Sequence, residues 1–283
     1  EHQAASTHRT FVLVSDGDLM EGITLEAATL AGRLKLGKLV VLYDDNNVVI
    51  DGAADVTFDA IGTCAAFEKL GWQVLEVANG EDVSALDAAI RDASAEVTRP
   101  SLIRVTTVIG HGSRQAGTSA IHSGALSAGD EEFVRTSLGL ESSLRFIVPG
   151  AVLHAWNERA SHGVHLREKW NTVMDSLEAS NPRLVELMQG KTAAQSIDSA
   201  AFRQAYEMTT EPEAARISGG KVLNVAATLN QALVGGVADL AAATMAYITD
   251  GGDYSPQLRT GRNIRFGVRE HAMAGIVNGI ALH

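Results

Sequence analysis

Cysteine is almost absent from this sequence: Cys64 is the single one among 283 residues. One cysteine excludes an internal disulfide framework and is typical of a reducing compartment, so we expect a cytoplasmic protein. Cys64 stands beside Ala65 and Ala66 on an expected helix, and we interpret it as a small core residue. The chain also lacks any apolar run of the roughly 18 residues that a membrane span needs, so we expect no membrane partner.

Basic residues are scarce relative to acidic ones. The sequence has 23 Lys and Arg against 34 Asp and Glu, which gives a net charge of -11. A surface this acidic argues against nucleic acid as a partner. An anionic small substrate would need a local cluster of Arg, His or bound metal. The length predicts two domains, and a hydrophobic content of 46% is enough to bury a core.

In the first half of the chain, short apolar runs alternate with helical patterns. The predicted strands are Phe11–Val14, Leu39–Tyr43, Gln73–Val77 and Ser101–Val108, and the predicted helices are Glu21–Leu34, Asp59–Leu70 and Asp82–Val97. Such alternation predicts an α/β fold with a parallel sheet flanked by helices.

The second half has weaker signals. Ile109–Ala128 is rich in Gly, Ser and His and predicts a long functional loop. A helical stretch, a polar linker and the beginning of a second α/β domain follow. We expect them at Val152–Leu187 (helix), Gln189–Ser199 (linker), Lys221–Leu233 (helix), Gly235–Gly236 (turn), Arg262–Gly267 (strand entering a loop) and Val268–Leu282 (helix).

The most informative segment runs from Ser15 to Gly52. An Asp-Gly turn follows one apolar strand and an Asp-Asp-Asn-Asn cluster follows the next. Between Gly17 and Asn46 lie 28 residues, about the length of one strand-helix-strand crossover. The Asp16 carboxylate and the Asn46 amide should therefore meet beyond the ends of neighbouring parallel strands. Oxygen ligands there suit a hard cation that holds a diphosphate. Taken singly, both residues are also ordinary turn residues at strand ends.

Three segments resemble transketolase, a thiamine diphosphate enzyme: SDGDLMEG, LAGRLKLGKLVVLYDDNNVVIDG and GRNIRFGVREHAMAGIVNGIALH. The first two contain the family's cofactor signature, in which Ser15 replaces the first glycine of Gly-Asp-Gly. The resemblance runs from about Thr7 to His283, with a divergent stretch near 140–215. It implies the thiamine diphosphate-binding fold.

The resemblance also implies three regions. They are an N-terminally truncated diphosphate domain (1–135), a helical linker region (136–212) and the start of a C-terminally truncated pyrimidine domain (213–283). The chain is identified as an internal segment that lacks the family's N-terminal start and C-terminal half. We therefore expect the isolated segment to be inactive.

A cofactor site follows from the resemblance, position by position. Asp16, Asn46 and the Val48 backbone carbonyl match the ligands of Mg²⁺, or of Ca²⁺ or Mn²⁺ in its place. Gly17 matches a glycine that contacts the diphosphate. The other implied cofactor-binding residues are Asn46, Ile50, Ile109, His122, Asp239 and Glu270.

Catalysis is implied at Glu270, which matches the glutamate that bonds the aminopyrimidine ring. A carboxyl group in that place works best when burial raises its pKa. His122 matches a histidine that touches both diphosphate and substrate, and Arg216 an arginine that holds the sugar phosphate. Glu21 and Glu26 match carboxylates that link two active sites across a dimer interface.

Plain alternatives stay open for these residues. Glu270 could be an ordinary glutamate at a helix N-terminus. His122 could be a solvated loop residue, or could join His111 and Arg114 in a small anion-binding patch. Arg216 could be a surface arginine.

The implied reaction is transfer of a two-carbon ketol unit from xylulose 5-phosphate to ribose 5-phosphate, in a homodimer with its active sites between subunits. Ala243 stands where the family has a phosphate-binding serine. That change keeps open a dihydroxyacetone synthase-like transferase that uses formaldehyde. The absent ends and changed loops keep open a non-catalytic transketolase-like partner.

Overall fold

The computed structural model describes residues 7–140, 146–188, 199–207 and 212–282. The chain forms two compact units, an N-terminal unit of His8–Ala155 and a C-terminal unit that is mainly Trp156–His283. In the described ranges, none of the helices combines the length and the apolar character that crossing a membrane requires.

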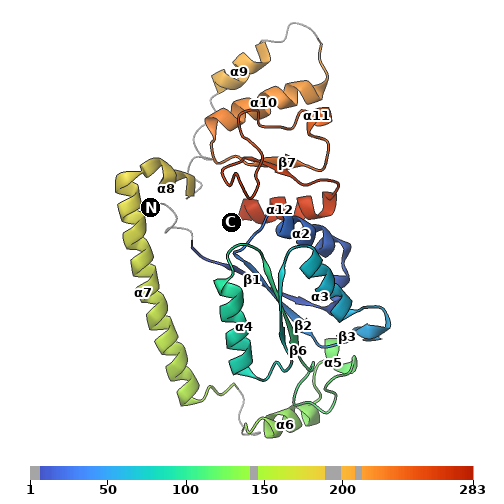
Figure 1. Ribbon diagram of the computed structural model, residues 1–283. Helices are drawn as coiled ribbons and strands as arrows, with labels where there is room; N and C mark the ends of the chain where they lie inside the picture. The colour runs from blue at the N-terminus through green and yellow to red at the C-terminus, as the bar shows by residue number, and fades with distance from the viewer. Residues whose placement is uncertain (1–6, 141–145, 189–198, 208–211, 283) are drawn as a thin grey trace. The chain divides into compact units, whose positions relative to one another are not determined.

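A four-stranded parallel sheet forms the centre of the N-terminal unit (Figure 1). Its strands, in spatial order, are β1 (Thr10–Ser15), β2 (Leu39–Asp45), β6 (Ser101–Thr106) and β5 (Gln73–Val77). All neighbouring pairs are parallel. The predicted α/β fold with a parallel sheet is confirmed, although the last predicted strand ends at Thr106 rather than Val108.

Helices cover both faces of this sheet. They are α1 (Asp16–Met20), α2 (Gly22–Arg33) and α3 (Ala60–Lys69) on one face and α4 (Val83–Ala95) on the other. Asp59 and Asp82 cap α3 and α4 by accepting hydrogen bonds from the Gly62 and Ala85 backbone amides, each at 2.9 Å. These aspartates fix where the two helices begin, close to the predicted starts.

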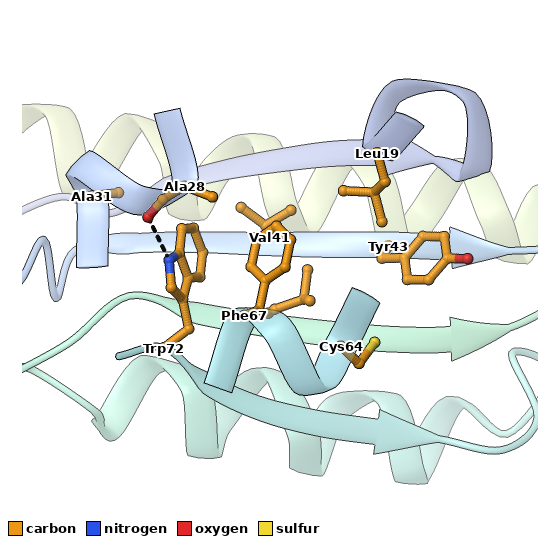
Figure 2. Close-up of a cluster of buried hydrophobic side chains, with 9 residues drawn as sticks. Leu19, Ala28, Ala31, Val41, Tyr43, Cys64, Phe67 and Trp72 are labelled. Atoms are coloured by element: carbon orange, nitrogen blue, oxygen red, sulfur yellow. Dashed lines mark hydrogen bonds between the residues drawn. The ribbon is translucent and has the colours of Figure 1, made fainter. Parts of the chain in front are cut away.

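The core beneath α2 and α3 is built around Trp72 (Figure 2). The Trp72 indole N–H donates to the Ala28 carbonyl at 2.9 Å, and its ring meets the Phe67 ring edge-on with 5.1 Å between centroids. Tyr43 belongs to the same cluster, and its hydroxyl points toward the carboxyl end of β2 (Figure 2). The Tyr43 hydroxyl is therefore a polar group of this core that lies toward the carboxyl end of the sheet.

The segment after β6 is not the continuous loop that the sequence suggested. It contains α5 (Ala120–Ser123) and then α6 (Ala128–Ser137). The buried Asp130 carboxylate accepts hydrogen bonds from the Ser113 hydroxyl at 2.8 Å and the Arg114 backbone amide at 3.2 Å. These two bonds anchor the glycine-rich part of the segment to α6.

The predicted helical stretch after residue 150 is two helices, α7 (Gly150–Ser180) and α8 (Pro182–Met188). They separate at Asn181 because Pro182 has no amide hydrogen to continue the helical ladder. The predicted linker falls almost wholly outside the described residues, and Ser199 begins α9 (Ser199–Glu207).

The C-terminal unit contains a two-stranded parallel sheet. Its further elements are α10 (Ala215–Leu229), β7 (Gly235–Val237), α11 (Ala241–Thr244), β8 (Asn263–Arg265) and α12 (Glu270–Leu282). The predicted turn at Gly235–Gly236 was wrong, because these glycines belong to β7. A Cβ at Gly236 would lie 2.4 Å from the Ile264 carbonyl oxygen and 2.6 Å from the Phe266 ring. Glycine is thus needed for close strand packing, which from sequence alone resembles a turn.

Arg262, the residue before β8, connects this sheet to the end of α10 through hydrogen bonds. Its guanidinium donates to the carbonyl oxygens of Ala227, Asn230 and Leu233, each at 2.9 Å. These are carbonyls at and beyond the C-terminus of α10, where a cation is favoured by the helix dipole.

Replacement of Gly32 should destabilise the N-terminal unit. A Cβ at Gly32 would lie 2.0 Å from the Leu70 carbonyl oxygen, so α2 and the end of α3 would have to separate. We expect Gly32→Ala to lower the free energy of unfolding by about 2–3 kcal/mol. Gly22→Ala in the same helix is the matched control, because nothing lies within 4 Å of a Cβ there. Urea unfolding followed by circular dichroism measures both, and equal stability of the two variants would contradict the packing described.

The Cys64 thiol should react slowly in the folded protein. Burial raises the pKa of this thiol to about 11, and the thiolate is the reactive form. At pH 8 the thiolate fraction is then on the order of one in a thousand. We expect modification by dithionitrobenzoate to be far slower in native protein than in urea, with a rate that rises up to about pH 11. A native rate equal to the rate in urea would show that Cys64 is not buried.

Candidate functional site

The carboxyl edge of the N-terminal sheet gathers the predicted metal ligands. The register pairs Ser15 of β1 with Asp44 of β2, so the two strands end side by side. Asp16 is the first residue after β1, and Asn46 is the first after β2. Both residues therefore leave the same edge of the sheet, as the crossover spacing predicts.

Asp16 is an acid buried in the interior, with 1% of its surface exposed. Its Oδ1 atom accepts a hydrogen bond from the Tyr43 hydroxyl. Its Oδ2 atom is also buried but finds no hydrogen-bond partner among the described residues. A buried carboxylate oxygen without a partner is costly, so this atom is where a cation would be most stabilising.

The surroundings of Asp16 oppose its charge. Burial raises the pKa of the Asp16 carboxyl. The Tyr43 hydroxyl and the Asn47 backbone amide lower this pKa, whereas the negative charges of Asp45 and Asp44 raise it further. Burial and the bond to Asp16 raise the pKa of Tyr43 well above its ordinary value, so the phenol keeps its proton and acts as the donor. A bound cation would reverse the balance at Asp16.

Arg104 compensates one of the neighbouring acids. Its guanidinium lies 2.7 Å from Asp45 Oδ2, and the pair is largely buried. Asp45 Oδ1 lies 3.3 Å from the Tyr43 hydroxyl. The carboxylate of Asp45 is therefore held by Arg104, and Tyr43 stands between this ion pair and Asp16.

The Asn46 side chain is fixed in orientation. Its Nδ2 donates to Asp44 Oδ2 at 3.0 Å, and its Oδ1 accepts from the Val48 amide at 3.0 Å. Asp44 is held in turn by the Thr107 hydroxyl at the end of β6. These bonds decide which way the amide points, so Oδ1 is the atom turned toward the following loop.

Val48 lies in a short hairpin of β3 (Val48–Val49) and β4 (Gly52–Ala53), joined by a turn at Ile50. Asn47 enters this hairpin with a left-handed φ of 57° and bonds the Asp55 carboxylate through its side chain. Val48 is buried, whereas Ile50 is 70% exposed. An exposed isoleucine at this edge is an apolar surface on which a ligand could pack.

The donor set fits a hard cation. One carboxylate oxygen, one amide oxygen and one backbone carbonyl are oxygen donors of the kind that Mg²⁺ prefers when phosphate oxygens and water complete its shell. No group of three or more His, Cys, Asp or Glu side chains within the described ranges is arranged to hold a metal. A cation here would therefore depend on a ligand such as a diphosphate.

Three further predicted residues follow strands or begin helices in this unit: Gly17, Ile109 and His122. Gly17 is in the first turn of α1, and a Cβ there would meet nothing nearer than Ser15 Oγ at 4.0 Å. Ile109 is half-buried beyond β6, and its carbonyl accepts from the Gly117 amide at 2.9 Å. His122 is exposed on α5. Open space beside Gly17 leaves room for a phosphate group near a helix start.

His111 and Arg114, which the sequence left open as an anion-binding patch, lie beside other groups of the chain. His111 Nδ1 lies 3.8 Å from the Glu81 carboxylate, and the Arg114 guanidinium stacks 4.4 Å above the Phe133 ring. The two side chains therefore contact different partners.

In the C-terminal unit, two predicted residues follow parallel strands. Asp239 lies two residues beyond β7 with a φ of 58°, and Glu270 begins α12 after β8. Arg216 is an exposed residue in the first turn of α10. Glu270 is exposed too, so the burial expected of it is not present within this chain. Its position at a helix N-terminus on the surface explains that difference.

Glu21 and Glu26 flank the start of α2 in the N-terminal unit. Glu21 precedes the helix and is exposed, and Glu26 lies in its second turn and is half-buried.

Sequence reasoning missed three residues that support the predicted ligands. These are Tyr43, Arg104 and Thr107. One signal was present: Tyr43 closes an apolar strand directly before two acids, and a buried tyrosine hydroxyl usually needs a polar partner. The contribution of Arg104 and Thr107 depends on the pairing of β6 with β2, which local sequence does not reveal.

Comparison with known families gives two matches that cover most of the chain. Residues 1–196 match the transketolase thiamine diphosphate binding domain, and residues 214–283 match the transketolase pyrimidine binding domain. Among curated proteins, the chain is 38% identical over 280 residues to transketolase 10 of Craterostigma plantagineum and 37% identical over 279 residues to the transketolase of Geobacillus stearothermophilus. Each alignment covers 98% of this chain but only 41% and 42% of those relatives, so the chain spans about two fifths of their length.

Solved structures give the same result. A transketolase mutant from Pichia stipitis in complex with xylulose-5-phosphate matches 96% of this chain and 41% of its own, with a TM-score of 0.88 and 32% identity. The transketolase from Leishmania mexicana matches 98% of this chain and 41% of its own, with a TM-score of 0.88 and 30% identity. From the two domain matches and these relatives we conclude that the chain belongs to the transketolase family.

Proposed function

We propose that the protein carrying this chain transfers a two-carbon ketol unit from a ketose phosphate, such as xylulose 5-phosphate, to an aldose phosphate, such as ribose 5-phosphate. The observation that carries this proposal is the buried Asp16 carboxylate, whose Oδ2 finds no partner in the described part of the chain, at the carboxyl edge of the sheet. It is supported by solved transketolases in complex with xylulose-5-phosphate and with sedoheptulose-7-phosphate.

Asp16, Asn46 and the Val48 carbonyl would hold Mg²⁺, or Ca²⁺ or Mn²⁺ in its place, and the cation would hold the diphosphate of thiamine diphosphate. When bound, this cofactor supplies the electron sink that stabilises a carbanion. Gly17 leaves space for the diphosphate beside the start of α1. Ile50 and Ile109 would pack on the apolar parts of the cofactor, which gives the exposed Ile50 side chain a partner.

Four further residues would contact the substrate or the cofactor, or transfer a proton. His122 would contact the diphosphate and the substrate, Arg216 the sugar phosphate, and Asp239 the cofactor. Glu270 would hold a proton against the aminopyrimidine ring. A carboxyl group that stays protonated near neutral pH has to be desolvated, and Glu270 is exposed in this chain.

A second subunit would supply that desolvation. We therefore propose a homodimer whose active sites lie between subunits, with Glu21 and Glu26 connecting the two sites. The proposed regions are a diphosphate domain over 1–135, a linker region over 136–212 and a pyrimidine domain from 213. The single buried thiol suits a reducing compartment, and we propose the cytoplasm.

Asp16→Asn should remove the divalent-cation dependence of thiamine diphosphate binding. The neutral amide has the shape of the carboxylate but lacks the charge that offsets the cost of stripping water from Mg²⁺. We expect cofactor affinity, measured by calorimetry, to be equal with Mg²⁺ and with EDTA in this variant. Asp92→Asn, an exposed acid on α4, makes the same change in net charge and should leave the dependence intact. Persistent Mg²⁺ dependence in Asp16→Asn would count against the assigned ligand.

Glu270→Gln should separate binding from turnover. The amide can occupy the same place at the start of α12 but cannot exchange a proton, so we expect ketol transfer to fall on the order of 100-fold or more in the complete enzyme. Cofactor affinity should change much less. Coupled assays with xylulose 5-phosphate and ribose 5-phosphate measure the rate, and the exposed Glu178→Gln on α7 is the control. A Glu270→Gln enzyme with normal turnover would rule out the assigned role.

A further inference from the structure

We propose that Tyr43 is a positioning residue: its hydroxyl binds one oxygen of Asp16, so that Asp16 is a monodentate metal ligand. Monodentate binding would favour Mg²⁺ over Ca²⁺ at the cofactor site. This inference rests on the proposed function, because it concerns the same cation. It assigns a role to a residue of the hydrophobic core that supplies no ligand itself.

Tyr43 is held rigidly. It is completely buried in β2, and its ring meets the Phe58 ring edge-on at 88°, with 6.4 Å between centroids. Leu19 of α1 belongs to the same cluster (Figure 2). A phenol packed in this way cannot swing out of its position without opening the core, so its hydroxyl is a fixed point at the carboxyl end of the strand.

The single phenolic proton is committed to Asp16. A tyrosine hydroxyl donates one hydrogen bond, and two carboxylates are near it. Asp45 lies 3.3 Å away and is already paired with Arg104 at 2.7 Å, whereas Asp16 Oδ1 makes the shorter contact with the phenol. Arg104 therefore satisfies one acid and leaves the proton of Tyr43 for the other.

The two carboxylate oxygens of Asp16 therefore have different roles, one as a hydrogen-bond acceptor and the other as the proposed metal ligand. Oδ1 accepts from Tyr43, and Oδ2, buried and unpaired within the described residues, remains for the cation. Mg²⁺ requires near-octahedral geometry with ligands at about 2.0–2.1 Å, which a single fixed oxygen satisfies. Ca²⁺ takes longer bonds and often both oxygens of one carboxylate, which the bond from Tyr43 opposes.

Tyr43→Phe removes this constraint and keeps the ring in the core. Mg²⁺ and Ca²⁺ would each be titrated by calorimetry into the full chain with saturating thiamine diphosphate. We expect the apparent dissociation constant of Mg²⁺ to rise about tenfold, as is typical when a group that orients a metal ligand is lost. Because Asp16 is then free to turn both oxygens to the metal, Ca²⁺ should lose less affinity, and the ratio of the two constants should shift by roughly threefold or more toward Ca²⁺.

Phe58→Leu is the matched control, because it loosens the packing around Tyr43 but keeps the hydroxyl. It should lower the melting temperature without changing the Mg²⁺ to Ca²⁺ ratio. An unchanged ratio in Tyr43→Phe, or an equal shift in both variants, would overturn the positioning role while leaving the proposed function intact. Cofactor binding by the unaltered chain that needs no divalent cation would overturn both.

Discussion

Burial of the Asp16 carboxylate at the carboxyl edge of the sheet is the constraint on which the rest of the site depends. The parallel register of β1 and β2 brings this acid to the Asn46 loop, and the hydrophobic core beneath α2 and α3 removes it from water. The Tyr43 hydroxyl donates a hydrogen bond to one of the two carboxylate oxygens and so offsets part of the cost of burial. The other oxygen makes no hydrogen bond among the described residues, and it is the atom on which the proposed cation would be most stabilising.

The two units contribute different parts of the proposed chemistry. The N-terminal unit carries oxygen donors whose orientation is fixed by neighbouring strands, as with Asn46 between Asp44 and Val48. The C-terminal unit carries Asp239 and Glu270 beyond a parallel strand pair, both exposed. Rigid, buried ligands suit the binding of a highly charged group, whereas an exposed acid needs a further surface before its pKa can rise. This difference is the physical reason for proposing a dimer.

Local sequence predicted the sheet and the strand-end positions of Asp16 and Asn46 well, because short apolar runs closed by Asp-Gly and Asp-Asp-Asn signals have few other interpretations. It failed where a residue's role depends on distant contacts. Gly236 resembled a turn residue but allows β7 to pack against β8, and the buried Asp130 that anchors the loop after β6 gave no signal. Tyr43 appeared to be an ordinary core residue, since only the pairing of β2 with β1 places its hydroxyl on Asp16. The desolvation expected of Glu270 stays a prediction for the same reason: it depends on what covers this residue, which is exposed in the single chain.

Anomalous diffraction from crystals grown with thiamine diphosphate and Mn²⁺ tests the central claim most directly. Mn²⁺ takes the oxygen ligands of Mg²⁺ and can be located independently of the protein density. The account predicts one strong peak about 2.2 Å from Asp16 Oδ2, with Asn46 Oδ1 and the Val48 carbonyl in the same shell and Oδ1 of Asp16 still bonded to Tyr43. A manganese peak elsewhere, or an Asp16 carboxylate without metal while the cofactor is bound, would contradict it.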